Sequence, residues 1–336
     1  MHPLRELTET ELRGRTSVKW SQYPEDVLPL WIAEMDARPA AVVTDALQDL
    51  VTRGDAGYGV VGHCLDAFAG FARRRWGWAV AEDAGVELAD VLTGLATAIR
   101  LATAPGAPVV LNPPVYPPFY EVVEWAERRV ALAPLGADGR LDLDRLDSVL
   151  AELGPGACYL LCSPHNPTGT VHTRVELEAV AQVAAEREAR LIVDEIHAPL
   201  APRGFVPFLT VEGGGRGFVA TSASKAFNLA GLKAGMLLAG PDAVHELAAI
   251  PPVVTFGASQ FGLIAQTAPS PVRMRGSTRW WATWRTTGGC CAICWTSTFP
   301  PSAGRAARGV IWTGSTSGIS SVRTLPSRSW SVDGSR

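Results

Sequence analysis

Lys225 lies in the segment Thr221–Lys233, which directly follows a strand-like apolar run at residues 217–220 and places small hydroxyl residues just before the lysine. Desolvation and neighbouring cations lower the pKa of a lysine, and a neutral amine can form a Schiff base with a carbonyl group. A single lysine is far more often a solvated surface residue. The hypothesis of a reactive amine therefore rests on the polar residues that accompany Lys225.

Two further polar clusters follow short apolar runs. Asn166 lies in the stretch Ser-Pro-His-Asn-Pro-Thr-Gly after the run at 157–162, and Asp194 and His197 follow the run at 190–193. Open α/β sheets bind ligands at the carboxyl ends of their strands, so we expect the three clusters to meet at one edge of a sheet. An amine, a carboxylate and an amide in this arrangement suit pyridoxal phosphate, which needs a lysine and an acid that keeps its ring nitrogen protonated.

The three clusters resemble those of fold-type I pyridoxal-phosphate enzymes, most closely the MalY/PatB-type C–S β-lyases (cystathionine β-lyases). The resemblance to this subgroup is carried by Lys19-Trp20, by residues 28–36 (Leu-Pro-Leu-Trp-Ile-Ala-Glu-Met-Asp), by residues 114–119 (Pro-Val-Tyr-Pro-Pro-Phe), and by the Pro-His-Asn-Pro and Asp-Glu-Ile-His stretches. It runs from about residue 15 to about residue 266. It implies an α/β large domain with a mixed, mostly parallel sheet, pyridoxal 5'-phosphate as cofactor, an amino acid as substrate and a homodimer.

The resemblance also implies roles for single residues. Lys225 would form the Schiff base and then act as the base on the substrate Cα, while Asp194 would keep the ring nitrogen protonated. Tyr116 would stack on the ring. Asn166 would hydrogen-bond the phenolic oxygen, and His197 would reach the same oxygen, although a lone histidine is often structural.

The remaining residues of the expected cofactor site lie around the lysine or near the phosphate. Ser222 and Ser224 flank Lys225, and Lys233 matches a basic position that contacts the phosphate. Tyr58, in a Gly-Tyr-Gly loop, is either a turn tyrosine or, as the resemblance implies, reaches the cofactor phosphate of the partner subunit.

The run at residues 91–99 predicts a strand, a glycine turn at Gly94 and then a helix. A helix N-terminus offers free N–H groups and a positive dipole end to a phosphate. A glycine turn occurs in any βα unit, but with the lysine cluster downstream we expect the backbone amides of Leu95 and Ala96 to bind the phosphate.

Two amphipathic helices are predicted from apolar spacing. The first covers residues 41–51 and buries one face (Val43, Ala46, Leu47, Leu50, Val51), and the second runs from about 173 to 189 (Leu177, Val180, Ala181, Ala184). The second helix returns the chain to the Asp194 strand and so completes a βαβ crossover. Asp36 is either a helix cap or a site residue, and Pro39 favours the cap.

Bulk properties restrict the class of protein. The chain has 336 residues and a net charge of −3, which gives no reason to expect nucleic acid or an anionic membrane as partner. No run of about 18 apolar residues occurs and the start lacks a signal-peptide pattern, so we expect a cytoplasmic protein with its six cysteines reduced. The expected domains are an N-terminal arm (1–40), the cofactor-binding domain (41–266) and an aberrant C-terminal segment (267–336).

The C-terminal segment departs from the family pattern. It is crowded with Trp, Cys and Arg, contains no Lys, has Asp333 as its only acid and shows no helical or strand period. Its Cys291-x-x-Cys294 pair has no second ligand pair, so no metal site is expected. We hypothesise a one-base frameshift near residues 266–271: in the shifted frame Trp280-Trp281 gives Val, and residues 280–297 acquire the spacing of an amphipathic helix. Resequencing the locus tests this.

The altered segment bears on function. The resemblance implies an arginine in the C-terminal domain that binds the substrate carboxylate. No arginine matches that role, because Arg323 and Arg328 both lie in the aberrant segment. Three functions stay open at this point: a C–S β-lyase, an aminotransferase of class I/II on the same scaffold, and an inactive or regulatory cofactor-binding remnant.

Overall fold

The computed structural model describes residues 4, 6–201, 204–269, 310–315 and 318–324. The chain divides into two units, one formed by residues 1–38 and 302–336 and the other by residues 39–301. The Cys291-x-x-Cys294 pair and Arg328 lie outside the described residues.

The smaller unit contains helices α1 (Glu9–Arg13) and α2 (Val18–Ser21) and a three-stranded sheet. In this sheet β9 (Val310–Ser315) pairs antiparallel with both β1 (Val27–Leu28) and β10 (Gly318–Thr324). The sequence pattern predicts no strand in this part of the C-terminal segment, so β9 and β10 differ from the expectation.

Asp36 is not a helix cap. Its carboxylate accepts hydrogen bonds from Lys19 Nζ at 2.8 Å and from Trp20 Nε1 at 3.0 Å. Helix α3 (Ala41–Arg53) begins after Ala40, which makes no side-chain cap. The Lys19-Trp20 pair and the last residue of the 28–36 stretch therefore form one partly buried ion-pair cluster in the smaller unit.

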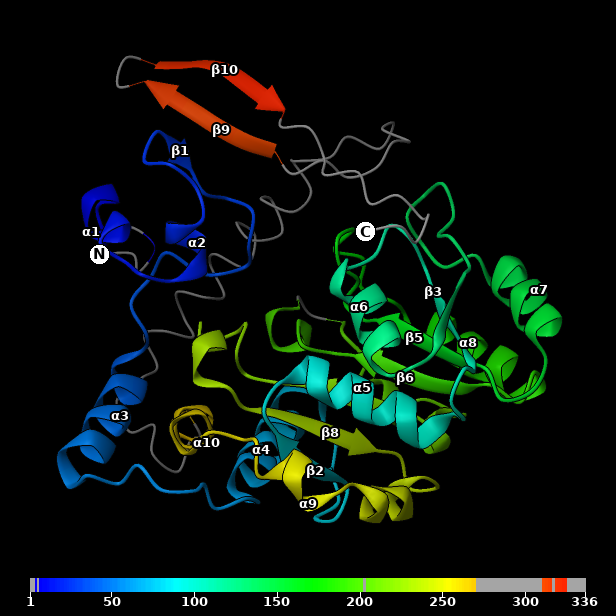
Figure 1. The fold of residues 1–336 in the computed structure, drawn as a ribbon. Coiled ribbons are helices and arrows are strands. Elements are labelled where there is room, and N and C mark those ends of the chain that lie inside the picture. Colours follow the sequence, from blue (N-terminus) through cyan, green and yellow to red (C-terminus); the bar gives the residue numbers. More distant parts are fainter. Residues whose placement is uncertain (1–3, 5, 202–203, 270–309, 316–317, 325–336) are drawn as a thin grey trace. The chain divides into compact units, whose positions relative to one another are not determined.

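The larger unit is built on a seven-stranded sheet with the order β2-β8-β7-β6-β5-β3-β4 (Figure 1). Its strands are β2 (Gly85–Leu88), β3 (Pro108–Leu111), β4 (Arg129–Leu132), β5 (Cys158–Cys162), β6 (Arg190–Asp194), β7 (Phe218–Thr221) and β8 (Gly235–Ala239). Only β8 runs antiparallel to its neighbours. The prediction of a mixed, mostly parallel sheet is confirmed.

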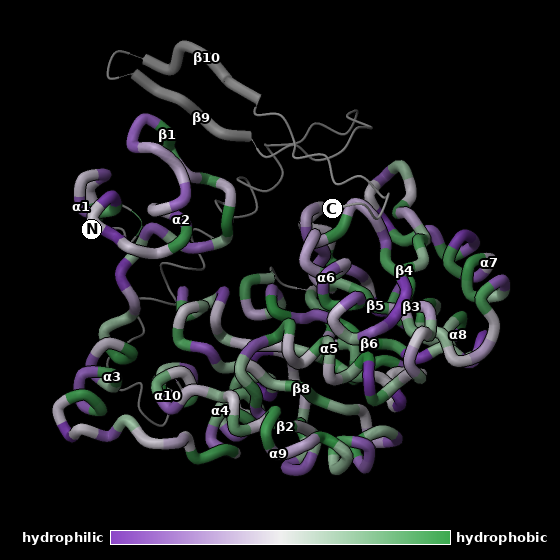
Figure 2. Tube along the Cα trace, viewed as in Figure 1, coloured by the Kyte–Doolittle hydropathy of each residue, from purple (hydrophilic) through white to green (hydrophobic). Residues whose placement is uncertain are grey.

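Helices cover both faces of this sheet, so its strands are apolar on both sides. Side chains alternate between the two faces: Leu160 and Ile192 join the core under α5 (Val91–Ala102) and α6 (Pro118–Trp125). Leu161 and Val193 join the core under α4 (His63–Trp76), α7 (Leu143–Leu153) and α8 (Arg174–Glu186). Figure 2 shows the central strands β5, β6 and β8 as largely hydrophobic, whereas the helices are of mixed character.

The remaining elements are short or lie beside the sheet. They are α3, α9 (Pro252–Thr255), α10 (Gln260–Thr267) and the 3-10 segments η2 (Ala198–Leu200), η3 (Phe208–Thr210), η4 (Gly214–Arg216), η5 (Ala230–Leu232) and η6 (Val244–Ala249). None of the helices among the described residues is long and apolar enough to cross a membrane. Cys64, Cys158 and Cys162 are buried free thiols.

The two helices predicted from apolar spacing are both present. All four predicted core residues of α8 are buried, and the segment β5-α8-β6 is the expected crossover between parallel strands. In α3, Val43 and Leu50 are buried, but Val51 is 60 % exposed. The prediction for Val51 is wrong because the contact face of α3 is narrower than the apolar stripe in its sequence.

Candidate active site

Three neighbouring strands end at the same edge of the larger sheet. Asp194, the last residue of β6, pairs in register with Cys162 of β5 and Ala220 of β7. Beyond the strands, the amide of Ser163 donates to the Asp194 carbonyl at 2.9 Å, and the amide of Glu195 donates to the Ala220 carbonyl at 2.9 Å. The segments that carry Asn166, Asp194 and Lys225 therefore leave the sheet side by side, as the sequence predicts.

Asp194 is a buried acid with a strongly altered pKa. It is 3 % exposed, and its carboxylate accepts a hydrogen bond from the Ile196 amide at 2.9 Å. Burial raises the pKa of Asp194 to about 7, although the Ile196 amide and the charge of Lys225 act in the opposite direction. An acid of this kind is suited to sharing a proton with a bound ring nitrogen.

Electrostatic interactions link Asp194 to Lys225 and Tyr116, and Lys225 to His197. Burial, together with the charge of Lys225, lowers the pKa of His197 to about 4, so His197 is neutral at pH 7. Burial also raises the pKa of Tyr116, with the charge of Asp194 as the next cause. The Tyr116 ring packs edge-on against Phe119 at 5.8 Å. Lys225, His197, Tyr116 and Asp194 thus lie within one electrostatic neighbourhood.

The serines beside the lysine hold the chain more than they face a ligand. Ser222 is 2 % exposed; its hydroxyl donates to the Ala234 carbonyl at 2.8 Å and accepts from the Ser224 amide at 3.0 Å. Gln266 of α10 supports the same turn, because its amide group accepts from the Ala223 amide at 3.0 Å and donates to the Ala234 carbonyl at 2.6 Å. Gln266 was not predicted, since no local pattern marks a glutamine that folds back onto a distant loop.

The predicted phosphate donors need a correction. Residues 91–99 contain no strand and no turn, because α5 begins at Val91 and Gly94 lies inside it. Leu95 and Ala96 are fully buried in the second turn, where amides bond to the carbonyls of the helix itself. The first-turn amides, which have no carbonyl partner within the helix, belong to Val91, Leu92 and Thr93, and that of Thr93 donates to the Asp90 carboxylate.

Asp90 is a second residue that the analysis of the sequence missed. It is the N-cap of α5: one carboxylate oxygen accepts from the Thr93 amide, and the other accepts from Lys233 Nζ, each at 2.9 Å. An acid directly before an apolar helical run is a known start signal and could have been recognised. Gly235 lets β8 lie against this turn, because a Cβ there would meet the Asp90 carbonyl carbon at 2.9 Å.

The structure does not bring Tyr58 together with the other predicted site residues. It is 93 % exposed, in the segment before α4. Buried Glu87 fixes the end of that segment by accepting the amides of Gly62, Cys64 and Leu65 at 2.9, 2.7 and 3.0 Å. A contact of Tyr58 with a partner subunit stays a prediction.

The donor set at this edge fits pyridoxal phosphate. It offers an amine, a buried carboxylate, an amide and an aromatic ring, with a helix start and a lysine for the phosphate. The hydroxyl of Ser163, directly after β5, is buried and has no hydrogen-bond partner among the described residues, which fits a site that receives a polar ligand. Arg323 lies in β10 of the smaller unit, and the residue that binds the substrate carboxylate stays unassigned.

Comparison with known proteins agrees with this chemistry. Residues 70–276 match the family model of class I and II aminotransferases, and the chain belongs to this family. Its neighbours of known structure have the fold of type I pyridoxal-phosphate transferases. One of them, a candidate pyridoxal-phosphate-dependent β-cystathionase from Corynebacterium diphtheriae, has a TM-score of 0.76 and 29 % identity, and the match covers 84 % of this chain and 74 % of that one.

Sequence relatives lie in the same subgroup. A Mycobacterium tuberculosis protein named as a candidate cystathionine β-lyase is 47 % identical over 277 residues, which is 80 % of this chain and 68 % of the relative. The cystathionine β-lyase of Corynebacterium glutamicum is 35 % identical over 260 residues, or 76 % of this chain and 69 % of the relative. The resemblance to MalY/PatB-type proteins inferred from the motifs is confirmed.

Proposed function

We propose that this protein is a pyridoxal-phosphate-dependent C–S β-lyase that converts cystathionine or other cysteine S-conjugates to a thiol, pyruvate and ammonia. The observation that carries the proposal is buried Asp194 at the carboxyl edge of the sheet, near enough to Lys225 for the charge of the lysine to act on the pKa of the acid. The cystathionine β-lyases among its relatives support the choice of reaction within the family.

Pyridoxal phosphate, when bound, supplies an aldehyde that condenses with an amine and a ring that withdraws electrons from the substrate Cα. The residues of the chain place and move protons around it. Lys225 removes the Cα proton, the Cβ–S bond breaks, and the sulfur leaves as a thiolate that takes up a proton. The remaining aminoacrylate adds water and gives pyruvate and ammonia.

Each of the other site residues has one task in this proposal. Asp194 would hold a proton at the ring nitrogen, and Asn166 would donate a hydrogen bond to the phenolic oxygen. Neutral His197 would contact the same oxygen, while the phenol of Tyr116 stays protonated because burial raises its pKa. The amides of Val91 and Leu92 and the ammonium of Lys233 would hold the phosphate.

The proposal includes a homodimer in the cytoplasm. Tyr58, exposed in each subunit, is then the residue that reaches the cofactor phosphate of the partner subunit. Light scattering of the loaded protein would measure the dimer, and loss of phosphate affinity in Tyr58→Phe would support the contact.

The decisive experiment loads the purified full chain with pyridoxal phosphate and supplies cystathionine without any 2-oxo acid. The expected result is release of thiol and pyruvate in equal amounts. An aminotransferase would release neither product, and on addition of a 2-oxo acid it would convert that acid to a new amino acid while the C–S bond of cystathionine stays intact. A visible absorbance band of bound cofactor with no product under either condition would support the inactive remnant.

A further inference from the structure

Asn166 lies in a turn whose support comes from outside the site. The amide of His165 donates to the Thr170 carbonyl at 2.8 Å, and the amide of Gly169 donates to the His165 carbonyl at 2.8 Å. The Thr168 hydroxyl lies 3.1 Å from His165 Nδ1. These contacts close the turn on itself but do not attach it to the rest of the unit.

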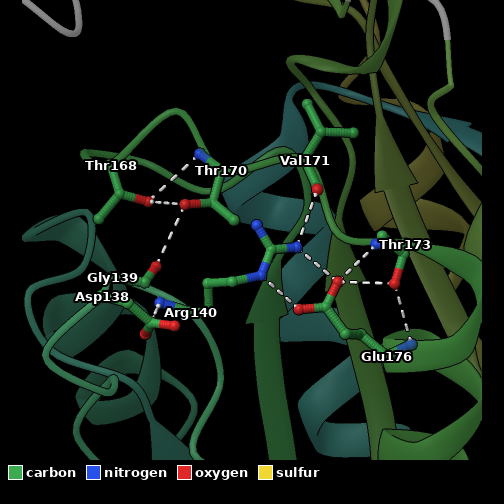
Figure 3. A network of polar contacts seen from close by, with 8 residues as sticks. All are labelled: Asp138, Gly139, Arg140, Thr168, Thr170, Val171, Thr173 and Glu176. Carbon is green, nitrogen blue, oxygen red and sulfur yellow. Dashed lines mark hydrogen bonds and ion pairs between the residues drawn. The ribbon is translucent and has the colours of Figure 1, made fainter.

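The sheet holds the start of the turn, because the Ser163 amide donates to the Asp194 carbonyl at 2.9 Å and the Cys162 thiol donates to the Pro164 carbonyl at 3.3 Å. The far side of the turn is attached by threonine hydroxyls (Figure 3). Thr168 Oγ1 donates to Thr170 Oγ1 at 2.8 Å, and Thr170 Oγ1 donates to the Gly139 carbonyl at 3.1 Å. Gly139 belongs to the loop between β4 and α7, so the turn that carries Asn166 is tied to this loop through single hydroxyl groups.

The same loop is fixed to α8 by a two-pronged ion pair. Arg140, the neighbour of Gly139, donates from Nε and Nη2 to the two carboxylate oxygens of Glu176 at 2.6 and 2.5 Å. Glu176 also accepts the amide and hydroxyl of Thr173 at 2.8 and 2.7 Å, so it is the capping residue of α8 as well (Figure 3). The bond from Arg140 lowers the pKa of Glu176 to about 2, and the pair stays charged at neutral pH.

We infer that the Arg140–Glu176 pair is a positioning device for Asn166: it fixes the Gly139 carbonyl, which through Thr170 and Thr168 sets where the Asn166 amide meets the phenolic oxygen of the cofactor. This inference rests on the proposed function. The two parallel N–H···O bonds define an orientation as well as an energy, which a single hydroxyl contact does not. Arg140 and Glu176 touch no reacting atom and act only through Asn166.

The chain contains a matched control. Arg187 and Asp147 form the same two-pronged pair, with Nε and Nη2 at 2.7 and 2.8 Å from the two carboxylate oxygens. The two arginine side chains are 38 % and 37 % exposed. Arg187 follows the C-terminal end of α8 and joins it to α7, whereas Glu176 lies in the first turn of α8 and bonds to Arg140, the neighbour of Gly139. Arg187→Met thus removes the same chemistry without touching the turn.

The test compares Arg140→Met, Arg140→Lys and Arg187→Met with the wild type in two measurements. In cofactor-free protein, Arg140→Met should speed amide hydrogen exchange at Gly169 and Thr170 by about tenfold, because local opening becomes easier. In loaded protein, it should raise the pH at which the visible spectrum of the cofactor titrates by about 0.5 to 1 unit, because a donor to the ionised oxygen is misplaced. Arg140→Lys should restore part of both changes, and Arg187→Met should produce neither.

The outcomes separate the inference from the proposed function. An unchanged titration in Arg140→Met, or an equal change in Arg187→Met, would overturn the positioning role. Should Arg140→Met fail to fold, Arg140→Lys decides by the same two measurements. A wild type that binds no pyridoxal phosphate would refute the proposed function and with it the role of Asn166, while the exchange comparison would still show whether the pair holds the turn.

Discussion

Two acids face the proposed cofactor site, and their surroundings are opposite. Asp194, at the ring end, is almost fully buried, and burial raises its pKa to about 7. Asp90, at the phosphate end, is partly exposed; burial would raise its pKa too, but the Thr93 amide and Lys233 outweigh burial and lower it. The ring end is therefore prepared to exchange protons, whereas the phosphate end carries fixed charges that are already paired.

The largest effect is expected at the ring end from Lys225→Ala. The substitution removes both the amine that links the cofactor and the base for the Cα proton, and loss of a general base alone costs a factor of about 10²–10⁴ in rate. The visible absorbance band of the linked cofactor should disappear, and thiol release should fall to background. A band that persists in Lys225→Ala would refute the assignment of this lysine.

Asp194→Asn should follow, with a loss of about 10²–10⁴ in kcat, because a neutral amide does not hold a proton at the ring nitrogen. Cofactor binding through Lys225 should survive, so the spectrum of the loaded variant provides the control for folding. If Asp194→Asn kept the wild-type kcat, Asp194 would not be needed as a proton donor to the ring, and the contrast with Asp90 would not hold.

The raised pKa of Asp194 also predicts how the cofactor-free protein responds to pH. The acid ionises near pH 4 in the unfolded chain but only near pH 7 in the folded one, so its contribution to stability is present below pH 4 and is lost as the pH rises to 7. Urea unfolding of wild type and Asp194→Asn should therefore diverge between pH 4 and 7, with the variant the more stable at pH 7. Parallel curves would mean that Asp194 is not desolvated as the fold indicates.

The sequence predicts the ring end better than the phosphate end, for a physical reason. Polar residues after apolar strands meet at one sheet edge because the strands are parallel, so Asn166, Asp194 and Lys225 could be placed from pattern alone. Their surroundings are apolar strands, which are themselves visible in the sequence. The low dielectric that shifts the pKa of Asp194 follows from those strands.

The phosphate end depends on where a helix begins, and helix boundaries are the least certain part of a sequence pattern. The sequence predicts a turn at Gly94, whereas α5 begins at Val91, so the predicted donors Leu95 and Ala96 lie four residues after the first-turn amides of Val91 and Leu92. The pair between Asp90 and Lys233 joins residues 143 positions apart, and no periodicity reports such a contact. The fold of Gln266 onto the lysine loop escaped prediction for the same reason.

The smallest expected effects test the phosphate end. Lys233→Met and Asp90→Asn should change the affinity for pyridoxal phosphate in opposite directions. Lys233→Met removes a charged donor and should weaken the binding of pyridoxal phosphate by about tenfold. Asp90→Asn keeps an N-cap side chain that accepts the Thr93 amide, but removes a negative charge near the phosphate. Asp90→Asn should free Lys233 to pair with the phosphate only, and should tighten the binding of pyridoxal phosphate by a few-fold.

Pyridoxal, which lacks the phosphate, is the matched ligand for this comparison. Its affinity, measured by the same absorbance titration, should be unchanged in both variants, because Asp90 and Lys233 act on the phosphate only. Weaker binding of pyridoxal phosphate in Asp90→Asn would show that the acid mainly orients Lys233, since the loss of orientation would then exceed the relief of repulsion. An equal effect on the affinity for pyridoxal would show that α5 and Lys233 do not bind the phosphate.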